Sequence, residues 1–117
     1  MTSAASKLLL LLSILFSSGH SQTKQKDNSL NVENGTLYYE TIGKGPAIVF
    51  IHGGQMDRRM WDPQTEAFKQ KYQIVRYDVR GYGKSSLPMK PFSHVRDLFD
   101  LLNHLKLKKA TLVGLSL

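Results

Sequence analysis

Apolar residues along the chain gather in short runs separated by polar, glycine-containing segments. Residues 47–51 read AIVFI, and a run that is apolar at every position predicts a strand buried on both faces. Residues 73–77 (QIVRY) and 110–113 (ATLV) have the length and the β-branched or aromatic content of two further strands. The pattern therefore predicts a buried sheet in the second half of the chain.

Two stretches between these runs have helical patterns. Asp62 followed by Pro63 is typical of an N-cap and a first helical position, and predicts a short helix over residues 64–70. Ser93 is typical of the N-cap of a second helix, which carries an apolar stripe. The residues of that stripe stand three or four positions apart: Val95, Leu98, Leu102 and Leu105. We expect this stripe to face the sheet.

A hairpin pattern precedes these elements. Strand-like segments at residues 30–32 and 37–42 flank Asn34-Gly35, and Asn-Gly is a strong signal for a two-residue turn with positive φ at both positions. The predicted order is then hairpin, strand, helix, strand, helix, strand. Because such crossovers are right-handed and make neighbouring strands parallel, we predict an α/β fold. We expect a mostly parallel sheet with an N-terminal antiparallel hairpin and flanking helices, spanning residues 30–117.

Glycine and polar residues occupy the loops that follow the predicted parallel strands. These loops are residues 52–55 (HGGQ), residues 78–86 and residues 114–117 (GLSL). Functional groups of parallel sheets gather at the carboxyl ends of the strands, so we expect the site there. A flavodoxin-like or dinucleotide-binding unit would need a phosphate loop after the first parallel strand. The HGGQ segment opens with histidine and lacks the G-x-G-x-x-G pattern, which disfavours that fold.

The motifs in these loops, in their order and spacing, resemble the α/β-hydrolases, and among them the single-domain esterases, lactonases and peroxidase-like enzymes. The resemblance extends from about residue 31 to residue 117. It rests on four segments: His52-Gly53-Gly54, Trp61-Asp62-Pro63-Gln64, residues 76–85 (RYDVRGYGKS) and Val113-Gly114-Leu115-Ser116. The resemblance implies a truncated α/β-hydrolase fold that ends at the nucleophile elbow.

This resemblance implies a catalytic role for Ser116. In a nucleophile elbow a strand turns sharply into a helix and exposes the serine hydroxyl. Ser116 would attack an acyl carbonyl, and the oxygen that becomes negative would receive backbone N–H groups from Leu117 and from Gly54 or Gln55. Loss of one such donor costs about 3 kcal/mol of transition-state stabilisation. The resemblance implies neither a metal nor an organic cofactor.

The other polar residues of these loops are expected to hold structure. We interpret His52 as a residue that orients the loop it begins. We interpret Asp78 and Arg80, together with Ser85, as residues that hold the second loop by local hydrogen bonds and charge pairing. None of the four is predicted to react with substrate.

The acid and the histidine of a catalytic triad are expected to be absent from this chain. In the α/β-hydrolases both follow the nucleophile in chain order. His94 and His104 precede Ser116 and fall in the second predicted helix, so we interpret them as surface residues. We therefore expect the 117-residue chain to be the N-terminal half of a hydrolase and to be inactive alone.

The N-terminal segment has the pattern of an export signal. Lys7 precedes an apolar run at residues 8–16, which is shorter than the roughly 20 residues of a membrane-spanning helix. Small residues suit a cleavage after Ser21. We expect a signal peptide at residues 1–21, a flexible leader at residues 22–29, and a periplasmic or extracellular protein without a stable membrane anchor.

Composition and charge narrow the partners. The chain has no cysteine, which excludes a disulfide framework, a thiolate metal site and a cysteine nucleophile. Its formal net charge is +7. Its basic residues are scattered over the predicted elements, and one local cluster lacks neighbouring aromatic residues: Lys106, Lys108 and Lys109. We therefore expect no nucleic-acid partner. The resemblance implies a small-molecule ester or lactone as substrate.

Several functions fit these residues. The leading hypothesis is a serine hydrolase of carboxylic esters or lactones that works through an acyl-serine intermediate. A catalytically incompetent truncated product and a small exported binding module are alternatives, as are a carbon–carbon bond hydrolase and a cofactor-free peroxidase within the family. Serine at position 116 disfavours the aspartate-nucleophile members, the dehalogenases and epoxide hydrolases.

Overall fold

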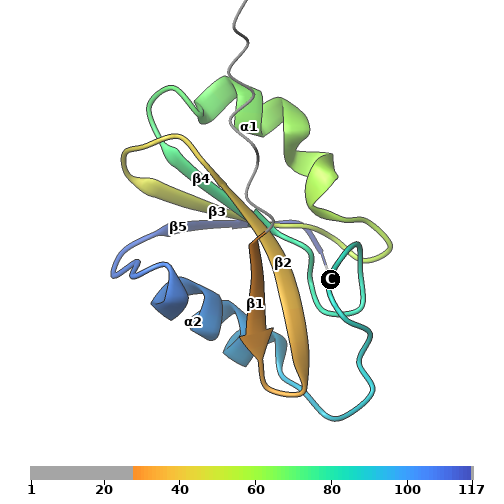
Figure 1. The fold of residues 1–117 in the computed structure, drawn as a ribbon. Helices are drawn as coiled ribbons and strands as arrows, with labels where there is room; N and C mark the ends of the chain where they lie inside the picture. Colours follow the sequence, from red (N-terminus) through yellow and green to blue (C-terminus); the bar gives the residue numbers. More distant parts are fainter. Residues whose placement is uncertain (1–27, 117) are drawn as a thin grey trace, which may run out of the picture.

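The computed structural model describes residues 28–116 (Figure 1). The predicted signal peptide, nearly all of the predicted leader and Leu117 lie outside the described residues. The first strand begins at Asn28, earlier than the predicted domain start at residue 30. Within the described part of the chain, no helix is both long and apolar enough to cross a membrane.

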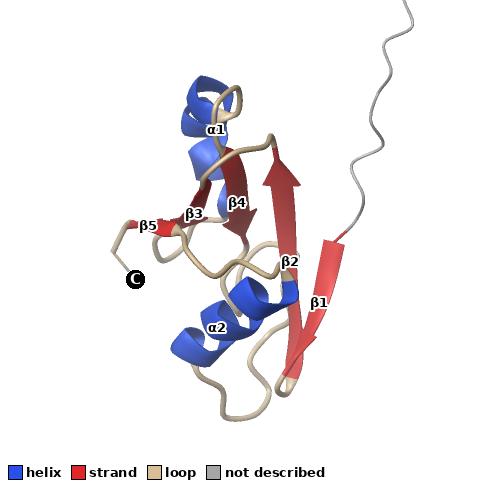
Figure 2. Cartoon of the chain, turned by 90° about the vertical axis from the view of Figure 1, so that its left-hand side faces the viewer, coloured by secondary structure: helices blue, strands red, loops and turns tan. Residues whose placement is uncertain are grey.

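One mixed sheet forms the centre of the molecule, with its strands in the order β1-β2-β4-β3-β5 (Figures 1 and 2). The strands are β1 (Asn28–Val32), β2 (Gly35–Ile42), β3 (Ala47–Ile51), β4 (Gln73–Tyr77) and β5 (Thr111–Gly114). β3 pairs in parallel with both β4 and β5, while β2 pairs antiparallel with β1 and β4. The predicted α/β class with an N-terminal hairpin is confirmed, and the loops after β3, β4 and β5 leave the same edge of the sheet.

The helices cover opposite faces of this sheet (Figure 1), and alternate side chains of β3 pack toward each of them. A short 3-10 helix η1 (Arg58–Trp61) leads directly into α1 (Asp62–Phe68), and α2 (His94–His104) follows β4. Phe50 packs with η1, its ring stacked on Trp61 with the centroids 4.7 Å apart. Val49, one residue earlier, points to the other face and belongs to the cluster that contains Leu101 of α2.

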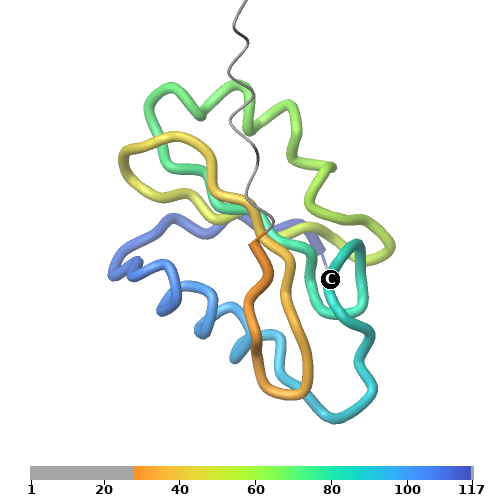
Figure 3. The backbone as a smooth tube through the Cα atoms, viewed as in Figure 1, coloured from red at the N-terminus to blue at the C-terminus, as the bar shows by residue number. Residues whose placement is uncertain are grey.

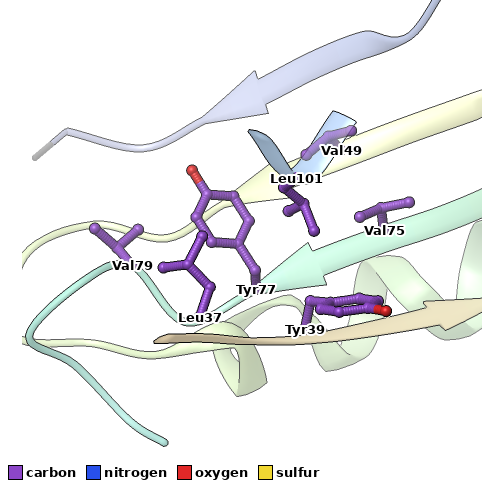
Figure 4. Close-up of a cluster of buried hydrophobic side chains, with 7 residues drawn as sticks. All are labelled: Leu37, Tyr39, Val49, Val75, Tyr77, Val79 and Leu101. Carbon is purple, nitrogen blue, oxygen red and sulfur yellow. The ribbon is translucent and has the colours of Figure 1, made fainter. Parts of the chain in front are cut away.

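The larger core cluster lies between β2, β3, β4 and α2 (Figure 4). Its members are Leu37, Tyr39, Val49, Val75, Tyr77, Val79 and Leu101. Val79 extends this cluster past the end of β4 into the loop that follows. The core therefore reaches the edge of the sheet where the functional loops begin.

The hairpin turn differs from its prediction by one residue. Val32 pairs with Gly35, so the two loop residues are Glu33 and Asn34 rather than Asn34 and Gly35. Of these two turn residues only Asn34 has a positive φ, at 59°. Gly35 opens β2, and it is required by a close approach: a side-chain Cβ there would lie 2.4 Å from Ser86 Oγ.

The first helix also begins differently. α1 starts at Asp62 instead of residue 64, and its N-cap residue is Trp61, which makes no side-chain cap bond. The predicted capping role of Asp62 is wrong because its carboxylate accepts a hydrogen bond from Arg76 Nη1. Asp57 caps η1 instead, since its side chain accepts the N–H of Arg59.

The second helix keeps its predicted cap but presents a different face. The Ser93 hydroxyl accepts the Arg96 N–H at 3.2 Å, which confirms the cap. Val95 is 79% exposed, so it does not belong to the buried stripe. The buried face is centred on Asp97 and Leu101, and Leu98, Leu102 and Leu105 line its sides. The loop that leads to this helix passes beside the hairpin turn (Figure 3), where Asn34 Nδ2 donates to the Pro91 carbonyl at 3.0 Å.

Candidate active site

The loops after β3, β4 and β5 meet at the edge of the sheet through main-chain contacts. The Leu115 N–H donates to the Ile51 carbonyl at 3.1 Å, and the Gly54 N–H donates to the Ser116 carbonyl at 3.2 Å. The Val79 N–H, in the loop after β4, donates to Nε2 of His52 at 2.8 Å. All three sequence-predicted loops are therefore in direct contact.

Ser116 lies at the end of the described chain and is exposed. Its segment runs beside the loop after β3 and continues the parallel pairing of β3 with β5. Any turn from Ser116 into a helix lies outside the described residues. The structure thus places the candidate nucleophile against residues 52–55, the candidate donor loop, which contains the predicted N–H donors Gly54 and Gln55.

Gly53 and Gly54 differ in the space around them. A Cβ on Gly53 would lie 2.8 Å from the Ser116 carbonyl oxygen and 3.3 Å from Cδ2 of Leu115. A Cβ on Gly54 would meet the hydroxyl of Tyr82 at 3.8 Å, which is an ordinary van der Waals contact. The close approach that glycine permits is therefore made to Gly53 by Leu115 and Ser116, the candidate nucleophile segment.

The two candidate donors of this loop are used differently. The Gly54 N–H is directed at the Ser116 carbonyl. Gln55 has a φ of 61° in a turn closed by the Met56 N–H and the Gly53 carbonyl at 3.3 Å. Within residues 28–116 the Gln55 N–H makes no hydrogen bond. The third predicted donor, Leu117, lies outside the described residues.

His52 is completely buried and joins two loops through its ring. Nε2 faces the Val79 N–H and Nδ1 lies 2.8 Å from the Gly53 carbonyl oxygen. Because a backbone N–H can only donate and a carbonyl can only accept, the ring proton belongs on Nδ1. Both ring nitrogens are therefore occupied by the main chain, and neither is available to the Ser116 hydroxyl.

Asp78 is also completely buried and ties the second loop to η1. Oδ1 accepts the Arg58 N–H at 2.8 Å, while Oδ2 accepts Arg58 Nη1 at 3.0 Å and the Lys84 N–H at 2.8 Å. Gly83 permits this arrangement, because a Cβ there would lie 2.2 Å from Oδ2. The carboxylate thereby holds η1, which follows the donor loop, against the loop after β4.

A second buried carboxylate continues this network toward α1. Glu40 of β2 accepts Nε of Arg58 at 2.8 Å and Nε of Arg76 at 2.7 Å. Burial by itself raises the pKa of Glu40, but the hydrogen bonds from the two arginines outweigh it and lower the pKa below its ordinary value. The sequence offered no signal for this network, because Glu40 and Arg58 carry no motif and lie far apart along the chain.

Arg80 does not pair with Asp78, although the two stand close in the sequence. It donates to Asp97 of α2 through Nε at 3.2 Å and Nη2 at 2.8 Å. It also donates to the carbonyls of Glu33 and Asn34 at 2.8 and 3.2 Å. The expected local pairing is thus replaced by contacts with the hairpin turn and α2. Burial raises the pKa of Asp97, against the effect of the Arg80 hydrogen bonds.

Ser85 bridges the same loop to β2. Its hydroxyl donates to the Asp78 carbonyl and accepts the Tyr38 N–H, the latter at 2.9 Å. Among residues 28–116, no group of three or more His, Asp or Glu side chains is arranged to hold a metal ion. Hydrogen bonds and buried ion pairs hold these loops together.

Comparison with known proteins identifies the family. The model of the alpha/beta hydrolase fold family matches residues 46–117, and the chain belongs to this family. It is 34% identical over 95 residues to 3-oxoadipate enol-lactonase 2 of Acinetobacter baylyi, covering 77% of this chain and 36% of that protein. It is 33% identical to a putative non-heme chloroperoxidase of Synechocystis, covering 81% of this chain and 35% of the relative.

Solved structures give the same result. A bromoperoxidase from Bacillus anthracis superposes with a TM-score of 0.72 at 35% identity, covering 77% of this chain and 35% of that one. The enol-lactonase from Burkholderia xenovorans superposes with a TM-score of 0.71 at 31% identity, covering 76% and 37%. The chain therefore spans about a third of the length of these relatives.

Proposed function

We propose that the chain supplies the nucleophile and part of the oxyanion hole of a serine hydrolase for carboxylic esters or lactones. The observation that carries the proposal is the Gly54 N–H, which lies 3.2 Å from the Ser116 carbonyl oxygen. It puts a backbone donor of the loop after β3 against the residue that the nucleophile motif selects. Such donors stabilise the oxygen that becomes negative during acyl transfer.

In the proposed reaction the Ser116 hydroxyl oxygen attacks the acyl carbonyl carbon and its proton passes to a base. The bond to the leaving alkoxide then breaks, the alkoxide takes the proton from the base, and the acyl group stays on Ser116. Water then attacks this acyl-serine, gives a proton to the base, and releases the carboxylic acid as the serine regains its proton. The Leu117 N–H and one N–H of the loop after β3, that of Gly54 or Gln55, would donate to the carbonyl oxygen. The Gln55 N–H makes no other hydrogen bond within residues 28–116, whereas the Gly54 N–H would first have to leave the Ser116 carbonyl.

The base is expected from a part of the protein beyond the described residues. Both ring nitrogens of His52 are bound to the main chain. His104 Nε2 lies 3.1 Å from the Tyr39 hydroxyl, and His94 lies at the start of α2 with its ring against Phe92. A serine without a base is a poor nucleophile. We therefore propose that the 117-residue chain alone does not catalyse hydrolysis.

The relatives guide the choice of substrate. Two of the proteins similar to this chain are named as enol-lactonases, which supports a lactone or a related ester as substrate. A peroxidase-like activity is the second candidate, because other relatives are named as a chloroperoxidase and a bromoperoxidase. Halogenation of monochlorodimedone by a complete enzyme, without lactone hydrolysis, would favour this second candidate.

A chimera tests the proposed hydrolase. Residues 28–116 would replace the matching segment of 3-oxoadipate enol-lactonase 2 from A. baylyi, so that the relative supplies the remaining chain. We expect the chimera to hydrolyse p-nitrophenyl butyrate, and a Ser116→Ala chimera to fall to the background rate. Circular dichroism checks that both chimeras are folded. A folded chimera whose rate equals that of Ser116→Ala contradicts the proposal, and the 117-residue chain assayed alone should give no Ser116-dependent rate.

We also propose that the protein is exported, on the pattern of Lys7 and the apolar run at residues 8–16. Expression in a bacterial host and N-terminal sequencing of the periplasmic fraction test this. The expected product begins at Gln22. Recovery of the uncleaved chain from the cytoplasm alone would contradict export.

A further inference from the structure

We infer that Tyr82 is a further residue of the acyl site, whose phenolic O–H donates a hydrogen bond to the oxygen bound by the Gly54-Gln55 segment. This inference rests on the proposed function. It starts from the position of the hydroxyl. A Cβ built on Gly54 would have one heavy atom within 4 Å, apart from those of its chain neighbours, and that atom is Oη of Tyr82 at 3.8 Å.

The backbone on either side holds Tyr82 in place. Its N–H donates to the Val79 carbonyl at 2.9 Å, and its carbonyl accepts the Ser85 N–H at 3.1 Å. The flanking residues Gly81 and Gly83 have φ values of 92° and 51°, a region that favours glycine. The buried Asp78 carboxylate further fixes this turn through the Lys84 N–H. The loop therefore presents the Tyr82 side chain from a constrained backbone.

The ring of Tyr82 packs on the donor loop. It meets His52 in an edge-to-face contact, with ring centroids 5.4 Å apart and planes at 79°. His52 is itself held by the main chain of both loops. Since this contact is made by the ring, the hydroxyl is not needed for the packing of Tyr82.

The hydroxyl has the chemistry of a ligand-binding group. Tyr82 is half-buried, and among residues 28–116 its O–H makes no hydrogen bond. It lies beside Gly54, whose N–H already binds an oxygen, the carbonyl of Ser116. The next residue, Gln55, has an N–H that makes no hydrogen bond within residues 28–116. An unused O–H beside this segment suits an acyl carbonyl or a carboxylate. A phenylalanine at this position would keep the ring contact and remove only that donor.

A titration of the full chain with butyrate tests this inference. Butyrate is the probe because its carboxylate oxygen stands in for the acyl oxygen of an ester. The ¹H–¹⁵N resonances of Gly54 and Gln55 report binding. We expect both to shift, and the apparent Kd to rise about tenfold in Tyr82→Phe, as for loss of one hydrogen bond to a charged acceptor.

Tyr72→Phe is the matched control, because Tyr72 follows α1 and its ring contacts Phe68 instead of the donor loop. We expect its Kd to equal that of the wild type. Urea unfolding should give equal stability for Tyr82→Phe and wild type, which separates a binding role from a structural one. An unchanged Kd in Tyr82→Phe, or a loss of stability that accounts for weaker binding, overturns the role of Tyr82.

The outcomes also separate this inference from the proposed function. If butyrate shifts the two amides of the wild type but Tyr82→Phe binds equally well, the inference about Tyr82 fails and the donor loop stands. If butyrate shifts neither amide in the wild type, the inference and the proposed donor loop both fail. The Ser116 chimera is assayed independently, and its failure removes the nucleophile without changing the result of the titration.

Discussion

The loops after β3 and β4 and the segment after β5 meet at one edge of the sheet, yet they are held very differently. The first two contain completely buried polar side chains, His52 and Asp78, each with several partners. The segment after β5 is exposed and makes two main-chain hydrogen bonds: the Leu115 N–H donates to Ile51 at the end of β3, and the Ser116 carbonyl accepts the Gly54 N–H of the donor loop. Leu112 and Leu115 are about half exposed, at 50% and 48%.

Within residues 28–116 the donor loop has contacts besides the one to Ser116, chiefly those of the His52 ring with the Gly53 carbonyl and the Val79 N–H. The η1 helix that follows the loop is held in turn by Glu40 of β2 and by Asp78. Within residues 28–116, residues 115 and 116 contact the rest of the site edge through the two main-chain hydrogen bonds given above. Under the proposed function, the scaffold would preorganise the groups that stabilise charge, and Ser116 would take its place against them.

The largest effect is expected from Asp78→Ala. This substitution leaves the buried guanidinium of Arg58 without one carboxylate partner and removes the acceptor of the Lys84 N–H. Removing one member of a buried ion pair costs about 3–5 kcal/mol. We therefore expect the free energy of unfolding in urea to fall by about that amount.

Glu66→Ala is the control for this prediction, since the pair of Glu66 with Lys69 is exposed. Exposed pairs contribute about 0–1 kcal/mol. If Asp78→Ala cost no more than Glu66→Ala, the two loops would not be held by the buried network, and the contrast with the nucleophile segment would disappear.

A pair of glycine substitutions extends the comparison to the backbone. In Gly35→Ala the new Cβ would lie 2.4 Å from Ser86 Oγ and 2.7 Å from Arg80 Nη1, so the network around Arg80 must shift. Overpacking of this kind costs about 1–3 kcal/mol. In Gly114→Ala, on β5, the nearest atom is 3.9 Å away, and we expect a change within about 0.5 kcal/mol. Thermal unfolding of both variants checks this, and equal effects would show that β5 is as tightly packed as the hairpin.

Gly53→Ala tests the contact between the donor loop and the segment that contains Ser116. Its Cβ would lie 2.8 Å from the Ser116 carbonyl oxygen, so we expect the nucleophile segment to move away and the Gly54 N–H to lose its acceptor. Amide hydrogen exchange should become faster at Gly54 while the Val79 amide, bound to His52, keeps its protection. Gly54→Ala is the matched control and should leave Ser116 in place. Unchanged exchange at residue 54 in Gly53→Ala would contradict the described contact.

The sequence predicted those parts of the fold that local patterns determine. The apolar run of β3 and the strand β4 have their predicted bounds, and Ser93 caps α2 as expected. The predicted buried face of α2 is wrong at Val95, which is exposed, because the polar residue Asp97 lies at the centre of the buried face. Asp97 is buried because Arg80 of a distant loop neutralises it, and a periodicity of apolar residues cannot reveal that.

The same limit applies to the candidate site. The meeting of the three loops follows from motifs placed at the ends of parallel strands, whereas the hydrogen bond of the Gly54 N–H to the Ser116 carbonyl is not predicted from them. The partners of Asp78 are not predicted either, because Arg58 stands 20 positions away and has no spacing relation to it. Such ion pairs arise only once β2, η1 and β4 are packed, so they depend on tertiary structure and not on any local signal.

The smallest change in stability is expected at Asp57, the N-cap of η1, which follows the donor loop. Its partner Arg59 is exposed, unlike the buried partners of Asp78. Hydrogen bonds from Arg59 lower the pKa of Asp57 from 3.8 to about 2. A lowered carboxyl pKa stabilises the fold above the unfolded value and loses that effect as pH falls from 3.8 toward 2. Asp57→Asn keeps a good capping side chain and removes only the charge.

We therefore expect Asp57→Asn to be slightly less stable than wild type near pH 7 and equal to it near pH 2. Urea unfolding across this pH range measures the difference. High salt should reduce it at neutral pH, because Arg59 is 71% exposed and its pairing is screened. A difference in stability between Asp57→Asn and wild type that persisted at pH 2 would contradict this prediction. It would mean that Asp57 stabilises η1 by packing, as the buried residues around Asp78 do, and not by its charge.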